Sequence, residues 1–199
     1  MPKIDTVFFD WGGVVANDPG DDFLAQLLKK IGATDEQVAS IFETYIKRFM
    51  RGQVTEQEYW QEIENNFGLH IPDTISDEFM RWNGLTANQD ILELVGELRQ
   101  NGLRVAILSN VIEPTYNVLK KAGYYDLFDE AIASCKVGFA KPEQEIYQIS
   151  LDKLGATANT SLFIDDKQSN LDPAIQMGFS VILAENPEQI IRDVRKQLT

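Results

Sequence analysis

The chain has one cysteine, one histidine and no long apolar run. Cys135 is the only cysteine among 199 residues, which excludes an internal disulfide framework and a cysteine-rich metal site. No apolar stretch approaches the roughly 18 residues that a membrane-crossing helix needs. The first ten residues also lack the apolar segment and the cleavage site of a signal peptide. These absences predict a cytoplasmic protein that does not act at a membrane.

Positive charge is also scarce. The sequence holds 18 Lys and Arg against 31 Asp and Glu, a formal net charge of -13. A field of this sign repels phosphate backbones, so nucleic acid is not an expected partner. If the substrate is an anion, the site needs a local cation, such as a metal, to reverse the sign. The 44% of apolar residues and 25% of charged residues are ordinary for a globular chain that buries a real core.

The apolar periodicity predicts an α/β protein with a helical insert. Five short apolar runs predict strands, at residues 4–9, 104–108, 131–133, 161–164 and 179–183. From about residue 87 these runs alternate with helical patterns, which is typical of a doubly wound parallel sheet with helices on both faces. We therefore expect an α/β core of residues 1–16 and 87–199, interrupted by a helical cap of residues 17–86.

Within the insert, apolar residues recur at helical spacing. Two helices are expected to begin at capping boxes, Thr34 with Gln37 and Thr55 with Glu58. A further short helix is expected around Phe79 and Trp82. Aromatic residues of these helices are interpreted as the core of the insert: Phe42, Phe49, Trp60 and Trp82.

Polar side chains follow the strands at the edge where a doubly wound sheet binds ligands. Six of them are expected to share this edge: Asp10, Ser109, Asn110, Lys141, Asp165 and Asp166. Three carboxylates in one place repel each other unless they are protonated or a cation neutralises them. Mg²⁺ is the cation that prefers carboxylate, carbonyl and water ligands. A carboxylate that faces a phosphoryl group held there can act as a nucleophile and form an aspartyl phosphate.

Four segments of the sequence, in order, resemble the four motifs of the haloacid dehalogenase-like hydrolases. They are FFDWGGVV, ILSN, AKPEQEIY and FIDDKQSNLDPAIQMG. The helical insert stands where the C1-capped subfamily I of this family carries its cap. Within the family, the chain most resembles glucose-1-phosphate phosphatases and the N-terminal phosphatase domain of soluble epoxide hydrolases.

The resemblance implies a role for each motif residue. It implies that Asp10 is the nucleophile and that Lys141 links the nucleophile to the phosphate. The implied Mg²⁺ ligands are Asp10, the Gly12 carbonyl and Asp166, with Asp165 beside them. The implied phosphate-binding residues are Ser109, Asn110, Lys141 and Gly13. Asn170 is expected to brace the loop of Asp166.

One position departs from the family pattern. Most family phosphatases carry a second Asp two residues after the nucleophile, which protonates the leaving group, and this chain has Gly12 there. Asn17, Asp18 or a cap residue could replace it. The expected function is a Mg²⁺-dependent phosphatase of small phosphorylated metabolites, such as sugar phosphates. Two alternatives stay open: an inactive or very slow binding protein, because of Gly12, and a 2-haloacid dehalogenase, which the acidic pair Asp165 and Asp166 disfavours.

Three other residues receive a plainer interpretation. His70 is expected to be a loop residue rather than a catalytic one, and Cys135 a small apolar side chain rather than a reactive thiol. Trp11 directly follows the predicted nucleophile and is interpreted as shaping the pocket.

Overall fold

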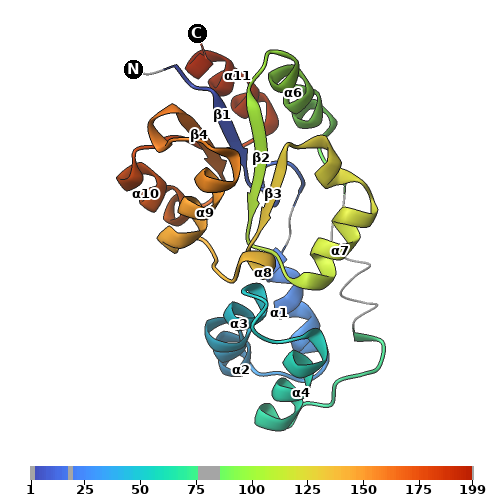
Figure 1. Ribbon diagram of the computed structural model, residues 1–199. Coiled ribbons are helices and arrows are strands. Elements are labelled where there is room, and N and C mark those ends of the chain that lie inside the picture. Colours follow the sequence, from blue (N-terminus) through green and yellow to red (C-terminus); the bar gives the residue numbers. More distant parts are fainter. Residues whose placement is uncertain (1–2, 18–19, 76–85, 199) are drawn as a thin grey trace.

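A computed structural model describes residues 3–17, 20–75 and 86–198 of the chain (Figure 1). Its strands form one parallel sheet in the order β3-β2-β1-β4-β5. They are β1 (Thr6–Phe9), β2 (Arg104–Ser109), β3 (Glu130–Ala133), β4 (Ser161–Asp165) and β5 (Ser180–Leu183). The five predicted strands are confirmed, with small shifts at their ends.

The helices follow the predicted alternation. They are α1 (Gly20–Lys30), α2 (Asp35–Ser40), α3 (Ile46–Met50), α4 (Glu56–Phe67), α6 (Gln89–Gln100), α7 (Glu113–Lys121), α8 (Ser134–Val137), α9 (Gln144–Leu154), α10 (Gln168–Met177) and α11 (Pro187–Leu198). A π-helical turn, η1 (Ile41–Tyr45), joins α2 to α3, and two 3₁₀ turns are η2 (Tyr124–Leu127) and η3 (Ala158–Thr160). The helix expected around Phe79 and Trp82 lies outside the described residues. Within the part of the chain that is described, no helix is both long and apolar enough to cross a membrane.

The sheet is covered on both faces, as a parallel sheet requires. Val7 and Phe9 point toward a core layer made with α6, α7 and α11. Phe8 points the other way, toward α9 and α10, where its ring meets that of Phe179 edge to face with centroids 6.0 Å apart. These two layers flank the sheet in Figure 1, and they fix the strands whose ends carry the polar residues.

The helices α1 to α4 form a separate apolar cluster beside the carboxyl edge of the sheet (Figure 1). Both predicted capping boxes are confirmed, at Thr34 and at Thr55. Phe49 stacks on Tyr59 with ring centroids 4.6 Å apart. Trp60 is buried in the same cluster and Phe42 packs against it, so the interpretation of Phe42, Phe49 and Trp60 as core is confirmed. Trp82 lies outside the described residues.

The two chain segments that lead into and out of this helical region run side by side. Ala16 forms an antiparallel bridge with Ala87, and the backbone N–H of Asn88 donates to the Val15 carbonyl at 2.7 Å. The insertion therefore leaves the α/β core and returns to it at neighbouring points. The division at residues 17 and 86 itself stays a prediction.

Candidate active site

The order of the strands brings the acidic residues together. The chain passes from β1 to β2 on one side and later returns to β4 on the other, so β1 lies at the point where the strand order reverses. Ligand sites of open α/β sheets lie at such a point, outside the carboxyl ends of the strands. Carboxylate oxygens of Asp10, Asp165 and Asp166 all lie within 4.8 Å of one another. The predicted convergence of these three residues is therefore observed.

Lys141 supplies a positive charge between two of these carboxylates. Its Nζ lies 2.9 Å from Oδ1 of Asp10 and 2.6 Å from Oδ2 of Asp165. The Lys141 side chain is only 1% exposed, and its ammonium lies 5.3 Å from the centre of the Phe163 ring. A buried ammonium in contact with two carboxylates is held at a fixed position by charge-assisted hydrogen bonds.

The Asp10 carboxylate is held by several donors. The Trp11 backbone N–H donates to Oδ1 at 2.7 Å, and the nearby Ser109 hydroxyl acts to lower the pKa of the carboxyl group. Burial raises the pKa of Asp10 to about 7; the Lys141 charge opposes this rise and the Asp165 charge adds to it. Partial covering of its carboxyl group also raises the pKa of Asp166, an otherwise exposed residue, with the Asp165 charge as the second cause. In both groups burial is the largest cause of the raised pKa, and for Asp10 it outweighs the opposing charge of Lys141.

Asp165 and Asp166 are neighbours with different surroundings. Asp165 is fully buried, and its Oδ1 accepts from the backbone N–H of Lys167 at 2.8 Å and from Nδ2 of Asn170 at 2.9 Å. Its Oδ2 accepts from Nδ2 of Asn170 at 3.1 Å and from Lys141. Asn170 thus braces this loop as expected, by holding Asp165. Asp166 is exposed, so its carboxylate is more accessible to a cation than that of Asp165.

Gly13 permits the close approach of Asp166. Its φ of +71° suits glycine, and an added Cβ would lie only 2.6 Å from Cγ of Asp166. Any other residue here would occupy the space that the Asp166 carboxylate fills. The donor set of three clustered carboxylates and one lysine leaves a net negative site, which fits a divalent cation with oxygen ligands. The predicted Mg²⁺ site therefore agrees with the residues that the fold assembles.

Asn110 and Trp11 contribute in ways that the sequence does not reveal. Both ends of the Asn110 side chain bind the main chain of Lys141: Nδ2 donates to its carbonyl at 2.8 Å, and Oδ1 accepts from its N–H at 2.8 Å. That the Trp11 ring shapes the pocket stays a prediction. This ring is buried in the core layer, with ring centroids 5.1 Å from Tyr124 and 6.4 Å from Tyr125. Only its backbone N–H is seen to reach Asp10.

The remaining candidates lie elsewhere or outside the described residues. His70 is 90% exposed in its side chain, near Glu64, which confirms the loop interpretation. Cys135 is half-buried, and burial raises the pKa of its thiol to about 11, so the reactive thiolate form is disfavoured at neutral pH. Asn17 is exposed, and Asp18 lies outside the described residues.

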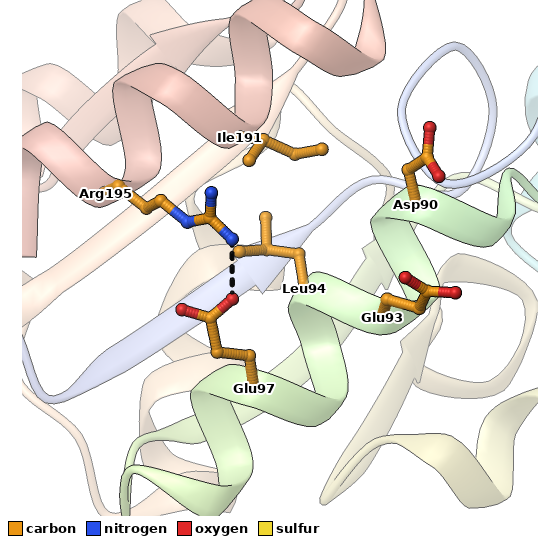
Figure 2. A pocket seen from close by; sticks show the side chains of 6 residues that line it. All are labelled: Asp90, Glu93, Leu94, Glu97, Ile191 and Arg195. Atoms are coloured by element: carbon orange, nitrogen blue, oxygen red, sulfur yellow. Dashed lines mark hydrogen bonds and ion pairs between the residues drawn. The ribbon is translucent and has the colours of Figure 1, made fainter.

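A groove of about 230 Å³ lies between α6 and α11 (Figure 2). It is lined by Asp90, Glu93, Leu94, Glu97, Ile191 and Arg195. Glu97 and Arg195 form an ion pair at 2.8 Å across it. None of the strand-end residues lines this groove, so the chemistry is assigned to the carboxyl edge of the sheet.

Comparison with known proteins places the chain in a family. A family model described as haloacid dehalogenase-like hydrolase matches residues 4–178. The chain belongs to the haloacid dehalogenase-like hydrolase family. The match covers all the strand-end residues described above.

Three relatives of this hydrolase are informative. A sesquiterpene phosphatase of Aspergillus oryzae is 29% identical over 173 residues, which cover 85% of this chain and 84% of that protein. Bifunctional epoxide hydrolase 2 of Sus scrofa is 28% identical over 87% of this chain and 32% of that protein. A family enzyme of Bacteroides thetaiotaomicron, solved in complex with magnesium and inorganic phosphate, shares the fold with a TM-score of 0.77 at 23% identity, over 94% of this chain and 98% of that one. The chain spans about a fifth to a third of the length of the first curated relatives it matches.

Proposed function

We propose that the protein is a Mg²⁺-dependent phosphatase of small phosphorylated metabolites, with sugar phosphates as the first class to test. The observation that carries this proposal is the contact of Lys141 Nζ with both Asp10 and Asp165, beside the exposed Asp166. The phosphatase among the relatives and the magnesium and phosphate of the Bacteroides structure support the same chemistry. Residues 17–86 would act as the cap over the substrate, and the cytoplasmic location remains a prediction.

The proposed metal ligands are Asp10, Asp166 and the Gly12 carbonyl. Asp165 stands behind them, because its oxygens already accept from Lys141, Asn170 and the Lys167 backbone. When bound, Mg²⁺ would neutralise the excess carboxylate charge and withdraw electron density from the phosphate oxygens.

Each residue of the site has a separate role in the proposed phosphoryl transfer. Lys141 and the Trp11 N–H hold Asp10 at Oδ1, which orients its carboxylate for in-line attack on phosphorus. As the bond from Asp10 oxygen to phosphorus forms, the bond from phosphorus to the ester oxygen breaks, and the departing oxygen takes a proton from solvent water to leave as the alcohol. Ser109 and the Asn110 backbone N–H would donate to the phosphate oxygens. Water then attacks the aspartyl phosphate, which releases phosphate and restores the Asp10 carboxylate.

Gly12 has a consequence for the choice of substrate. General acid catalysis is worth roughly 10²–10⁴ in rate, and glycine offers no side-chain acid beside the leaving group. Esters whose leaving groups need no protonation, such as p-nitrophenyl phosphate, are therefore expected to react faster than sugar phosphates. Gly12 is also the observation that keeps an inactive binding protein as the second candidate.

The nucleophile variant tests the proposal. We expect the wild-type protein to release phosphate from p-nitrophenyl phosphate and from sugar phosphates only when Mg²⁺ is present. Asp10→Asn should lower this rate by about 10³-fold or more, because the amide is no nucleophile. Asp126→Asn, at an exposed position of η2, is the control and should retain the wild-type rate. Equal rates for the wild type and Asp10→Asn would reject the enzyme in favour of the binding protein.

A further inference from the structure

The helical insert is tied to the core by a two-point ion pair. Arg51 directly follows α3, and Glu143 directly precedes α9. Nε of Arg51 donates to Oε2 of Glu143 at 3.0 Å, and Nη2 donates to Oε1 at 2.9 Å. Nη1 donates to the Lys47 carbonyl at 3.0 Å, which fixes the guanidinium on its own helix. The side chains are 22% and 33% exposed, so this is a well-oriented pair that is partly shielded from water.

The same Glu143 carboxylate holds the segment that carries Lys141. Its Oε2 accepts from the backbone N–H of Ala140 at 2.7 Å. From the other side, the Asn110 side chain binds the Lys141 main chain at both its N–H and its carbonyl. The segment 140–143 is thus clamped by β2 through Asn110 and by the insert through Arg51 and Glu143.

Two further contacts surround this ion pair. The Ser134 hydroxyl, which is fully buried, donates to the Met50 carbonyl at 2.7 Å. A Cβ added to Gly52 would lie 2.3 Å from the Cys135 carbonyl oxygen, so the two backbones are in close contact there. Residues 50–52 of the insert are therefore seated on residues 134–143 of the core. The bond from Arg51 to Glu143 can form only when the insert occupies this seat.

We propose that Arg51 is a positioning residue, through which seating of the insert on the core fixes Lys141 in its catalytic geometry. This inference rests on the proposed function for its kinetic consequence. Lys141 Nζ must lie within hydrogen-bond distance of both Asp10 and Asp165. A shift of the segment 140–143 would move the backbone from which the Lys141 side chain extends. An ångström of misplacement can cost about 100-fold in rate, so a contact remote from the phosphate can control the rate of the chemical step.

Kinetics separate this role from direct substrate binding. Arg51→Gln should lower kcat by about tenfold or more, with KM changed by less than about twofold, because the lost contact holds the segment of Lys141, which orients the nucleophile. Arg48→Gln is the matched control: Arg48 donates to Glu62 at 2.7 Å within the insert and should retain the wild-type kcat. Arg51→Lys should recover part of kcat, since an ammonium can bind one oxygen of Glu143. A rise in KM at constant kcat would overturn the proposal, because it would mean that Arg51 binds substrate.

A double-mutant cycle tests the route through Glu143. Glu143→Gln keeps an oxygen that can accept from Ala140 but loses the charge that binds Arg51. If Arg51 acts through Glu143, the double variant should lose little more kcat than Arg51→Gln alone. If the fold-losses in kcat of the two single variants multiply in the double variant, Arg51 and Glu143 act independently, and the proposed route is overturned.

Hydrogen exchange gives a readout that does not depend on activity. Arg51→Gln should speed exchange of the Ala140 amide in peptides that cover residues 138–146, whereas Arg48→Gln should not. Unchanged exchange at this segment would overturn the positioning role. If exchange responds as expected but the wild-type protein hydrolyses no phosphate ester, the proposed function fails while the structural coupling holds.

Discussion

At the scale of single residues, Lys141 controls the electrostatics of the site. It is fully enclosed and touches Asp10 and Asp165, whose carboxylates have little access to water. Removing one partner of a buried ion pair leaves an uncompensated charge, which is costlier than the loss of an exposed pair. Lys141 therefore supports both the proposed chemistry and the stability of the fold.

Lys141→Met should lower the free energy of unfolding by about 3–5 kcal/mol at pH 8. Lys153→Met is the matched control, because Lys153 pairs with Glu130 at 2.8 Å on the surface with both side chains more than a third exposed; it should cost under about 1 kcal/mol. Denaturant unfolding at several pH values measures both.

The deficit of Lys141→Met should shrink as the pH falls. The pKa of Asp10 is already raised to about 7, chiefly by burial, and loss of Lys141 raises it further. In the folded variant, Asp10 therefore becomes protonated at a higher pH than in the wild type. Protonation removes the uncompensated charge of its carboxylate. The deficit should therefore be smaller at pH 5 than at pH 8. A deficit of equal size for Lys141→Met and Lys153→Met would contradict this account.

The site residues differ in how far the sequence reveals them. Asp10, Ser109 and Asp165 could be placed together because each ends a strand or directly follows one, and the carboxyl ends of parallel strands meet at one edge. The side chain of Asn110 could not be assigned to Lys141 by this reasoning. Its hydrogen bonds join residues 31 positions apart, and strand periodicity does not report side-chain partners.

At the scale of elements, local signals predict helices better than contacts between helices. The capping boxes at Thr34 and Thr55 involve residues three apart, so the sequence shows them directly. The π-helical turn η1 interrupts a stretch that reads as one continuous helix. The seat of Gly52 against Cys135 joins two distant segments and has no signal in either of them.

Gly52→Ala should destabilise the protein by more than its backbone conformation alone would predict. Gly68 has almost the same φ, +65° against +64°, but no atom lies within 4 Å of its added Cβ. Gly68→Ala should therefore cost about 1 kcal/mol, from the left-handed backbone alone. Gly52→Ala should cost about 1–3 kcal/mol more, because its Cβ overlaps a backbone carbonyl. Thermal unfolding compares the two, and equal costs would show that the insert does not rest on Cys135.

At the scale of the whole molecule, the acidic character predicted the need for a cation. The formal net charge is -13, and the fold gathers three carboxylates at one edge of the sheet. The fold class was predictable from alternating strands and helices, since that alternation allows few arrangements. The order of the strands could not be predicted from the sequence, because the crossing from β3 to β4 on the other side of the sheet depends on packing between distant segments.

Mg²⁺ should raise the melting temperature of the protein, because an ion that binds only the folded state stabilises it. The increase should be larger at pH 8 than at pH 5, since the ligand carboxylates must be deprotonated and the pKa values of Asp10 and Asp166 are raised. Differential scanning fluorimetry with millimolar MgCl₂ measures this increase. NaCl of equal ionic strength is the control for general screening of the net charge. The same shift with either salt would argue against a specific site.

The paired bridge between Ala16 and Ala87 has a consequence for how such proteins diversify. The two segments that join the insert to the core are paired at this bridge, and backbones paired in this way lie about 5 Å apart, so a short reverse turn could span them. We therefore expect that the length of the helical insert can change without altering the register of the sheet.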